Sequence, residues 1–370
     1  MRVGLILEQA LSRVPGGAGR YSTELAAALA ASQAPDDELC SWVACHRVVT
    51  RARVTGVAGP RRLPVPARLL ARAWQRGWPP RLGGVDVVHA PTPLFPPASA
   101  PIVVSVHDAV AWTHPETLTP RGVAWHRAMI ERAARQAAAV AVLTHAVADE
   151  LSRAVPELAA DKIVLLGAGV SPRLLRPPSA EESAEVASRL GLPERYLLSL
   201  ATLEPRKGLD VLIGALGRLG TSAPPLVVVG QPGWGDVDVA SLATRAGLPD
   251  RAVTILGRLP DPDLAVALRS AAALVMPSRA EGFGLPIAEA AAVGTPVICS
   301  DVPALVEVCD GAAVVVARGD DVALAEAIEA VWTDSALAAD LAKRGLVASR
   351  RHTWEAVARR AWACYRGLAG

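Results

Sequence analysis

The sequence predicts an α/β protein of two domains, each a doubly wound parallel sheet with helices on both faces. Short apolar runs rich in β-branched residues alternate with helical stretches along the whole chain, a pattern typical of βαβ units. At 370 residues the chain is also longer than one hydrophobic core usually supports. The pattern is interrupted by prolines at 172, 177 and 178 and then restarts. Two Rossmann-like domains are therefore expected.

The apolar runs give the expected strands. In the first half of the chain they are Arg2–Leu7, Val85–His89, Ile102–His107, Ala138–Thr144 and Ile163–Leu166. In the second half they are Tyr196–Leu200, Leu226–Val229, Val253–Leu256, Ala273–Met276, Val297–Cys299 and Val314–Val316. We expect an N-terminal domain over 1–175, a C-terminal domain over 176–350, and a helix within 351–370 that packs back across the junction. Doubly wound sheets bind ligands beyond the carboxyl ends of their strands, so a site in a cleft between the domains is predicted.

Composition and charge are those of a folded, soluble protein. Hydrophobic residues make up 51% of the chain and charged residues 20%, which excludes a disordered chain. No apolar run approaches the roughly 18–20 residues of a membrane span, and Glu8 interrupts the short apolar start. We therefore expect neither a signal peptide nor an integral anchor, and predict a cytoplasmic protein. A net charge of only +2 argues against a general nucleic-acid binder.

Cysteine and histidine usage gives no sign of a metal centre. The five cysteines are odd in number and include no C-x-x-C pair, and the seven histidines are scattered. Buried, reduced thiols are expected. No metal site is predicted.

Positive charge is concentrated in one part of the chain. Between residues 41 and 85 there is no Asp or Glu, whereas arginine occurs at nine positions. Within this stretch Ala67–Arg76 is predicted to be a helix with arginines four residues apart on one face and apolar residues on the other. Such a helix is typical of a segment that lies on an anionic membrane surface. Its candidate contacts are Arg68, Arg72, Trp74 and Arg76. The alternative is a solvated surface helix in a chain that prefers arginine to lysine.

The most informative motif is Glu281–Glu289, which sets two glutamates eight positions apart around a glycine-rich turn. Pro286 suits the first turn of a helix and Gly294 the position just past its end, so a helix of roughly two turns is predicted over 285–293. Its N-terminus faces the turn Gly282–Gly284, where free backbone N–H groups and the helix dipole attract phosphate. The carboxylates can accept hydrogen bonds from vicinal hydroxyls. These features predict a site for a sugar nucleotide, the alternative being an ordinary helix with an acidic flank.

Three further segments follow predicted strands. Gly16–Tyr21 is expected to form a glycine-rich turn before a helix, although it does not complete G-x-G-x-x-G; a plain flexible turn is the alternative. Arg206 and Lys207 are adjacent cations that suit a diphosphate, unless they form surface ion pairs. The pair His107–Asp108 interrupts an apolar run at the functional edge of the first sheet and is predicted to take part in the site.

Together these motifs resemble those of the retaining glycosyltransferases of GT-B architecture, the large family 4-like group that uses sugar nucleotides and carries an E-x7-E motif. The matching segments are Gly16–Tyr21, His107–Asp108, the "EPRK" of Glu204–Lys207 and the "PS-x-x-EGFGLP-x-x-E" of Pro277–Glu289. The likeness covers nearly the whole chain. It implies an N-terminal domain that binds the acceptor and a C-terminal domain that binds the nucleotide sugar, facing each other across a cleft.

The resemblance also implies a role for each matching residue. Arg206 and Lys207 would hold the donor diphosphate and offset the charge of the leaving group without a divalent metal. Glu281 would bind hydroxyls of the donor sugar, and Glu289 those of the ribose. His107 would hydrogen-bond the transferring sugar or position the acceptor. The other donor contacts would be Gly16, Gly17, Phe283, Gly284 and Leu285.

The activity implied is retaining transfer of a hexose, with no cofactor, to a glycan, a lipid-linked acceptor or a small molecule. The "EPRK" segment and first glycines look most like enzymes that transfer mannose from GDP-mannose during surface-polysaccharide or glycolipid synthesis. The family is thought to let the leaving phosphate accept the acceptor's proton, so neither glutamate need be a nucleophile. Many relatives carry Gly-Arg where this chain has Ala201–Thr202, so Arg206 is expected to supply that guanidinium.

Several alternatives stay open. The donor could be a UDP-sugar and the acceptor a specialised metabolite, or the fold could serve a sugar-nucleotide epimerase. A pyridoxal-dependent phosphorylase is disfavoured because, with Lys207 assigned to phosphate, only Lys162 and Lys343 are left for a Schiff base. The incomplete glycine fingerprint disfavours a nicotinamide oxidoreductase. Some relatives dock on the inner membrane through a basic helix of the N-terminal domain, which favours the membrane interpretation of 67–76.

Overall fold

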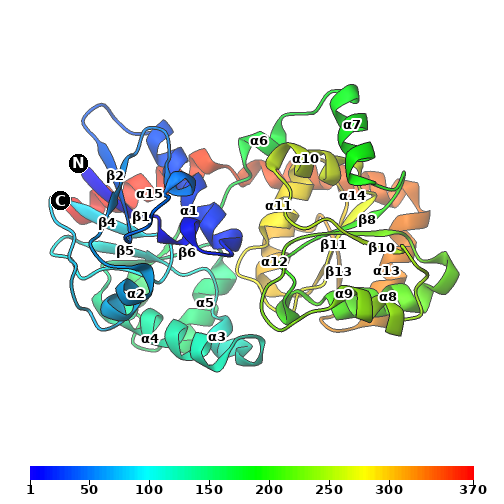
Figure 1. Cartoon of the computed structure of the whole chain (residues 1–370), viewed down its shortest axis with the longest axis horizontal. Helices are drawn as coiled ribbons and strands as arrows, with labels where there is room; N and C mark the ends of the chain where they lie inside the picture. The colour runs from blue at the N-terminus through cyan, green and yellow to red at the C-terminus, as the bar shows by residue number, and fades with distance from the viewer. The chain divides into compact units, whose positions relative to one another are not determined.

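The computed structural model describes all 370 residues, and the chain divides into two compact units (Figure 1). Unit 1 is formed by residues 1–169 together with 353–370, and unit 2 by residues 170–352. The chain therefore leaves unit 1 once and returns to it for its last helix. Each unit holds one sheet in which all neighbouring strands are parallel. The predicted class of two doubly wound parallel sheets is confirmed.

Unit 1 contains a seven-stranded sheet in the order β3-β2-β1-β4-β5-β6-β7. Its strands are β1 (Arg2–Ile6), β2 (Glu38–Val43), β3 (Ala58–Arg62), β4 (Val87–Ala90), β5 (Ile102–Ser105), β6 (Ala139–Val142) and β7 (Ile163–Leu165). Its helices are α1 (Gly16–Ala31), α2 (Ala67–Gln75), α3 (Val110–Thr113), α4 (Pro120–Gln136), α5 (His145–Ala154) and α15 (Trp354–Ala369). Strands β4, β5 and β6 are buried along their whole length, as parallel strands covered on both faces are.

The sequence pattern predicts five of these seven strands and misses β2 and β3. Strand β2 mixes polar and apolar residues, so it lacks the continuous β-branched run of a buried parallel strand. Strand β3 lies at the edge of the sheet, carries Pro60 and two arginines, and is mostly exposed. Edge strands tolerate proline and are often protected by charge, which removes the apolar signal.

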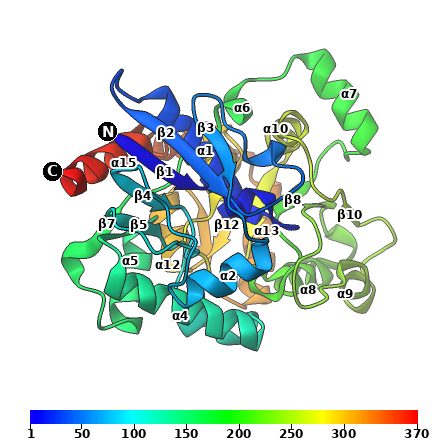
Figure 2. The same cartoon turned by 60° about the vertical axis from the view of Figure 1, so that its left-hand side comes forward.

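Helices cover both faces of the unit 1 sheet (Figure 2). On one face α1 packs against α15, and Tyr365 and Trp362 of α15 are buried there. On the other face α2 lies beside α4, and the core between them and the sheet includes Trp74 and Met129. The guanidinium of Arg132, on α4, lies over the Phe95 ring and donates hydrogen bonds to backbone oxygens in this core.

Unit 2 contains a six-stranded sheet in the order β10-β9-β8-β11-β12-β13. Its strands are β8 (Leu197–Leu200), β9 (Leu226–Val229), β10 (Val253–Ile255), β11 (Ala273–Met276), β12 (Val297–Ser300) and β13 (Val314–Val316). Its helices are α6 (Pro172–Leu175), α7 (Ala180–Leu190), α8 (Leu209–Leu219), α9 (Val239–Arg245), α10 (Asp261–Ser270), α11 (Leu285–Ala292), α12 (Pro303–Cys309), α13 (Asp321–Thr333) and α14 (Ser335–Ala348). All six predicted strands of this half are confirmed.

The strand order of unit 2 has one point where the chain reverses its direction of winding. The first strand, β8, lies between β9 and β11, so connections run outward on either side of the β8–β11 pair. The carboxyl ends of two such strands form the crevice where open α/β sheets bind ligands. None of the helices in the structure is both long enough and apolar enough to cross a membrane.

Candidate functional site

In unit 2, two loops bring the predicted phosphate and sugar residues together. The loop after β8 forms a short 3₁₀ helix over Pro205–Lys207, and the loop after β11 carries Glu281. Because β8 and β11 are neighbours in the sheet, both loops emerge at the same edge. The sequence-based expectation that Glu281 lies at the same end of the same sheet as Arg206 and Lys207 is confirmed.

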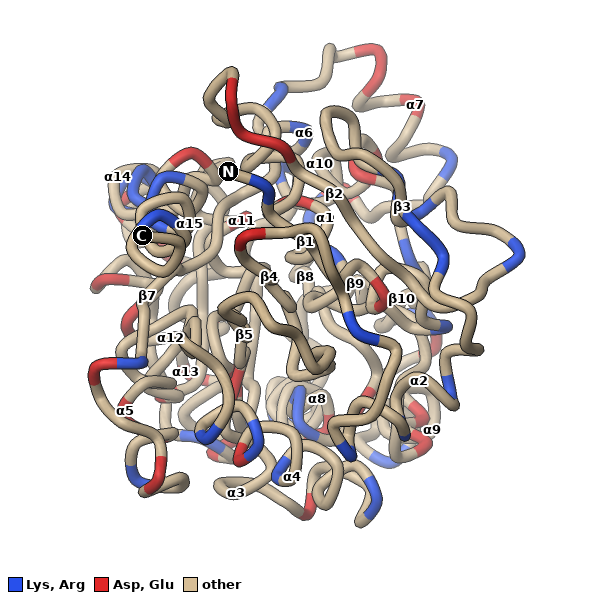
Figure 3. The backbone as a smooth tube through the Cα atoms, turned by 90° about the vertical axis from the view of Figure 1, so that its left-hand side faces the viewer, with Lys and Arg blue, Asp and Glu red and all other residues tan.

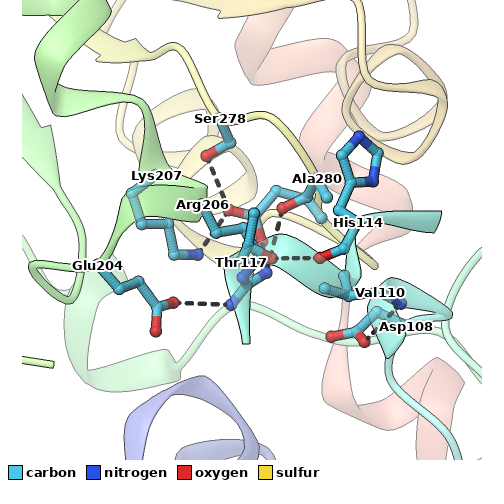
Figure 4. A network of polar contacts seen from close by, with 10 residues as sticks. Asp108, Val110, His114, Thr117, Glu204, Arg206, Lys207, Ser278 and Ala280 are labelled. Carbon is cyan, nitrogen blue, oxygen red and sulfur yellow. Dashed lines mark hydrogen bonds and ion pairs between the residues drawn. The ribbon is translucent and has the colours of Figure 1, made fainter. Parts of the chain in front are cut away.

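Glu281 is the centre of a compact ion-pair cluster. Figure 4 labels its neighbours Glu204, Arg206, Lys207 and Ser278. Glu281 Oε1 accepts hydrogen bonds from Lys207 Nζ at 2.5 Å and from Ser278 Oγ at 2.8 Å. Its Oε2 lies 3.2 Å from Arg206 Nη1, and Arg206 Nη2 donates to Glu204 Oε1 at 2.9 Å. Two cations thus face two carboxylates. The Glu281 side chain is only 7% exposed, so this cluster is largely removed from water.

The surroundings keep Glu281 ionised. Burial alone would raise the pKa of this carboxyl, but the charges of Lys207 and Arg206, with hydrogen bonds from Lys207 and Ser278, hold its pKa below the ordinary value. A carboxylate offers about four lone-pair positions, of which three are used here. The group is therefore an anion at neutral pH with room for roughly one further hydrogen bond.

A second ion pair fixes the backbone of the two loops. The Arg279 guanidinium donates to both oxygens of Asp210, at 2.8 and 2.6 Å, and to the carbonyl oxygen of Pro205 at 2.8 Å. The Arg279 backbone N–H also donates to the carbonyl oxygen of Arg206 at 2.8 Å. Arg279 thus holds the cation-bearing loop against the Glu281 loop. Neither Arg279 nor Asp210 could be predicted from the sequence, because a lone cation and a lone carboxylate far apart in the chain form no pattern.

Gly208 lets these loops approach closely. Its φ is +67°, and a Cβ atom there would lie 2.1 Å from the carbonyl oxygen of Pro277. Gly284 has φ +85°, and a Cβ there would lie 2.4 Å from a methyl of Leu305 on α12. Only glycine combines this left-handed backbone with such close contact. The loops after β8 and β11 therefore each need a glycine, Gly208 and Gly284, to reach their positions in the site.

Helix α11 begins after Gly284, with Pro286 in its first turn, close to the predicted span. Pro286 has no N–H, and the Ile287 N–H donates to the Gly284 carbonyl oxygen at 2.9 Å, so the Leu285 N–H and the helix dipole are what this N-terminus offers an anion. Phe283, 5% exposed, anchors the preceding turn by an edge-to-face contact of 5.3 Å with the His352 ring. Glu289 lies in the second turn of α11 and is 2% exposed. The structure thus assembles the predicted turn and helix start, with Glu289 packed inside the unit.

In unit 1, the predicted glycine-rich turn is part of a helix. Helix α1 begins at Gly16, so all of Gly16–Tyr21 lies in its first two turns, and the expectation of a turn before a helix is wrong. The turn itself is made by residues 7–15, which include a 3₁₀ helix at Glu8–Leu11. A Cβ at Gly19 would lie 2.5 Å from the Pro15 side chain, so this glycine serves helix packing. The N–H groups of Gly16 and Gly17 lie at the helix N-terminus, where anions are favoured.

His107 follows β5 and is held by two neighbours. Its Nε2 lies 2.7 Å from the carbonyl oxygen of Pro91, and Tyr21 of α1 packs edge-on against its ring at 4.9 Å. Burial lowers the pKa of His107, although the Pro91 hydrogen bond and the Asp108 charge oppose this. Asp108 accepts a hydrogen bond at 3.2 Å from the N–H of Val110, the first residue of α3. The imidazole is therefore mainly neutral near pH 7.

The helix predicted over 67–76 is confirmed as α2, but Trp74 is wrong as a candidate surface contact. Trp74 is fully buried, and its Nε1–H donates to the carbonyl oxygen of Pro80 at 3.0 Å. Trp74 lies four residues after Leu70, so the two side chains share one face of the helix. Both are buried, and this face therefore meets the core. The arginines at 68, 72 and 76 are exposed, as are Leu69 at 53% and Trp78 at 58%. Figure 3 shows the cations along β3 and α2.

The chain was compared with known proteins. The family described as Glycosyltransferase Family 4 matches residues 15–174, and Glycosyl transferases group 1 matches residues 181–346. The chain is 30% identical over 273 residues to O-antigen chain mannosyltransferase B of Escherichia coli, covering 73% of this chain and 71% of that protein. It is 28% identical over 403 aligned positions to phosphatidyl-myo-inositol mannosyltransferase of Mycobacterium leprae, covering 100% and 97%. The Anabaena protein Alr3699/HepE, solved with UDP-glucose, matches 100% of both chains at 19% identity and a TM-score of 0.78.

Two parallel-sheet units with these loops at the β8–β11 edge define the class as a glycosyltransferase of GT-B architecture. The chain belongs to the family 4-like group of these enzymes, as the matches to both halves and to the O-antigen mannosyltransferase show.

Proposed function

We propose that the chain transfers mannose from GDP-mannose, with retention of anomeric configuration, to a glycan, a lipid-linked acceptor or a small-molecule acceptor. The observation that carries the proposal is the buried Glu281 held by Lys207 and Arg206 at the carboxyl edge of unit 2. Two relatives named as mannosyltransferases support the choice of sugar. The product would belong to a cell-surface polysaccharide or glycolipid, made on the cytoplasmic side.

The donor site follows from the charges of unit 2. Arg206 presents a planar fork of donors and Lys207 a compact charge, which together suit the oxygens of a diphosphate. Both cations are neutralised by carboxylates in the structure, so a diphosphate would share them with Glu281 and Glu204. The N-terminal end of the α11 dipole would add positive potential. We propose that these groups offset the charge of the leaving nucleotide and that no metal ion is needed.

The carboxylates are proposed to bind hydroxyl groups and not to attack carbon. Glu281 has a lowered pKa and three of its lone-pair positions are taken, so it is a poor base and a poor nucleophile. Its unused position would accept a hydrogen bond from a donor-sugar hydroxyl. Glu289 would take the ribose hydroxyls. The acceptor hydroxyl would lose its proton to the departing phosphate as the new glycosidic bond forms on the same face, which balances the reaction without a protein base.

Unit 1 is proposed to bind the acceptor. The N–H groups of Gly16 and Gly17 would approach a phosphate, and His107 would hydrogen-bond the transferring sugar. The exposed arginines of α2, with Leu69 and Trp78 beside them, are proposed to lie on an anionic membrane that carries a lipid-linked acceptor.

A donor screen tests the proposal. GDP-mannose, GDP-glucose, UDP-glucose and UDP-galactose would each be assayed by nucleotide release and thermal shift, because a ligand that binds only the native state raises the melting temperature. We expect GDP-mannose to give the largest shift and release. A stronger response to a UDP-sugar would favour the second candidate function, which is transfer from a UDP-sugar donor. We consider this candidate because the chain is similar in fold to a structure solved with UDP-glucose. An interconverted nucleotide sugar without release would identify an epimerase and overturn the proposal, and proton NMR of the product would report the anomeric configuration.

A further inference from the structure

The orientation of His107 is set by two contacts within unit 1. Its Nε2 lies 2.7 Å from the Pro91 carbonyl oxygen, which can only accept, so Nε2 carries the hydrogen. The one hydrogen bond of the His107 ring is made by Nε2, so Nδ1 is left to accept one from a hydroxyl. The Tyr21 ring meets the imidazole edge-on, with an interplanar angle of 88° and a centroid distance of 4.9 Å. Tyr21 is therefore the side chain that fixes the plane of the ring.

Tyr21 is supported in turn by the C-terminal helix. The Trp354 ring, at the start of α15, packs against Tyr21 at a centroid distance of 5.5 Å. Tyr21 is 1% exposed and Trp354 is 4% exposed. On its other side Trp354 meets Gly169, where a Cβ would lie 2.4 Å from the Trp354 backbone nitrogen and 2.7 Å from its ring. Trp354 is thus confined between Gly169 and Tyr21, and cannot move without moving Tyr21.

Ordinary core packing does not explain the polar atoms of this stack. The Trp354 indole N–H is buried and has no hydrogen-bond partner. The Tyr21 hydroxyl is also buried and makes no hydrogen bond of normal geometry, although Ser105 is near enough to oppose the rise in its pKa that burial causes. A buried polar group without a partner is unfavourable, and such groups in native structures call for an explanation. The shape and rigidity of the two rings beside His107 are what the pair supplies.

A second route joins α15 to the strand that precedes His107. Tyr365 of α15 lies 2.5 Å from His89 Nδ1, and His89 Nε2 lies 2.9 Å from Ser105 Oγ at the end of β5. Burial, with a smaller effect of His107, lowers the pKa of His89 to about 3, so His89 is neutral under working conditions. The helix therefore fixes both the backbone that leads into His107 and the ring that packs on it.

We propose that Tyr21 and Trp354 are positioning residues for His107, so that helix α15 is a working part of the acceptor-unit site and not only its cover. They hold the imidazole in the orientation in which Nε2–H donates to the Pro91 carbonyl oxygen, with Nδ1 ready to accept a hydrogen bond from a sugar hydroxyl. The proposal rests on the role given to His107 in the proposed function. Its structural half, the fixed tautomer and orientation, stands independently of the substrate.

The test compares variants that keep or remove the rings. Tyr21→Phe and Trp354→Phe keep a ring, whereas Tyr21→Leu and Trp354→Leu remove it. Trp42→Leu is the matched control, because Trp42 is a buried tryptophan of the same unit that lies on β2, in the core shared with Leu70 and Trp74 of α2, away from the Tyr21–Trp354 stack. Misplacement of a site group by about 1 Å can cost up to a hundredfold in rate. We expect the leucine variants at 21 and 354 to lower kcat for nucleotide release from GDP-mannose by about tenfold, with donor KM within twofold.

Nitrogen-15 NMR of labelled histidine supplies the readout that a merely structural role would not move. We expect the His107 signals to report the Nε2–H tautomer in the wild type and Tyr21→Phe, and a mixture of tautomers in Tyr21→Leu. Trp42→Leu should lower thermal stability while leaving both the His107 signals and kcat unchanged. Unchanged His107 signals in Tyr21→Leu, or an equal loss of kcat in Trp42→Leu, would overturn the proposal. Retained turnover in His107→Ala would instead overturn the role of His107 in the proposed function, with the NMR result still deciding the positioning.

Discussion

Arg279 and Asp210 form a two-point ion pair, with the guanidinium nitrogens 2.8 and 2.6 Å from the two carboxylate oxygens. The same arginine binds the Pro205 carbonyl oxygen through its side chain and the Arg206 carbonyl oxygen through its backbone. This pair touches neither Glu281 nor Lys207, yet it ties together the loops that carry them. Burial would raise the pKa of Asp210, but the hydrogen bonds and charge of Arg279 hold it below its ordinary value.

Removing this pair should slow the reaction by loosening the loop that carries Arg206. We expect Arg279→Ala to lower kcat for nucleotide release by about tenfold, because small displacements of electrostatic groups are costly in rate. Arg218→Ala is the control, since Arg218 forms an exposed ion pair with Asp321 in the same unit at 3.0 Å. It should leave kcat unchanged. Equal rates for the two variants would show that the Arg279 pair does not organise the site.

Loss of either site cation should have a larger effect. Lys207→Ala and Arg206→Ala each remove one preorganised donor from the charge that grows on the leaving phosphate. We expect kcat to fall by roughly two to three orders of magnitude in each case, as for removal of one key electrostatic donor. Calorimetry with GDP would show how much of the loss is already present in nucleotide binding. Turnover near that of the wild type would contradict the assignment of these cations to the diphosphate.

The pH dependence of stability should carry a signature of His89. Its pKa is lowered by burial to about 3, against 6.5 for the free side chain, so below pH 6.5 the unfolded chain binds a proton that the folded chain does not. The stability is therefore fully present above pH 6.5 and is lost as the pH falls toward 3, by up to about 1.4 kcal/mol per pH unit. His89→Gln should flatten this slope. Urea unfolding between pH 4 and 7 measures it, and parallel slopes in the two proteins would rule the explanation out.

The buried parallel strands could be predicted from the sequence, because burial on both faces leaves a continuous apolar run. Strand β3 could not, since its only neighbour is β2 and its residues are mostly exposed. The glycines at 16 and 17 illustrate a second limit. Glycine permits both a turn and a helix start, and the position of Pro15 and the contact at Gly19 decide for the helix. The contact between Gly19 and Pro15 cannot be read from the local sequence.

The candidate site also contains some residues that could be predicted from the sequence and others that could not. The juxtaposition of Arg206, Lys207 and Glu281 follows from strand order and could be expected. The partners Ser278, Arg279 and Asp210 depend on side-chain geometry that no spacing encodes. Trp74 shows how a helical pattern misleads: its spacing fits an amphipathic face, but the sequence does not state whether that face meets a membrane or the protein's own core. Burial resolves this in favour of the core.

Gly208 should be irreplaceable in a way that other left-handed glycines are not. At Gly208 a Cβ would lie 2.1 Å from a backbone oxygen with φ +67°, whereas at Gly191 φ is +63° and nothing lies within 4 Å. Gly191→Ala should therefore cost only the backbone strain, about 1 kcal/mol. Gly208→Ala should cost that strain and force the two site loops apart, so we expect at least 2–3 kcal/mol in urea unfolding and loss of turnover. Similar losses in both variants would show that the close contact is relieved at no cost.

Charge on α2 decides the proposed membrane contact. The triple variant Arg68→Glu, Arg72→Glu and Arg76→Glu reverses three exposed charges next to Leu69 and Trp78, and each basic residue near an anionic surface is worth about 1 kcal/mol. We expect it to abolish sedimentation with vesicles that contain anionic lipid. The matched control reverses Arg121, Arg135 and Arg153, which are exposed on α4 and α5 of the same unit. Because the control changes net charge equally, an equal loss of binding would mean that only total charge matters, and sedimentation of the α2 variant like the wild type would show that α2 does not bind the surface.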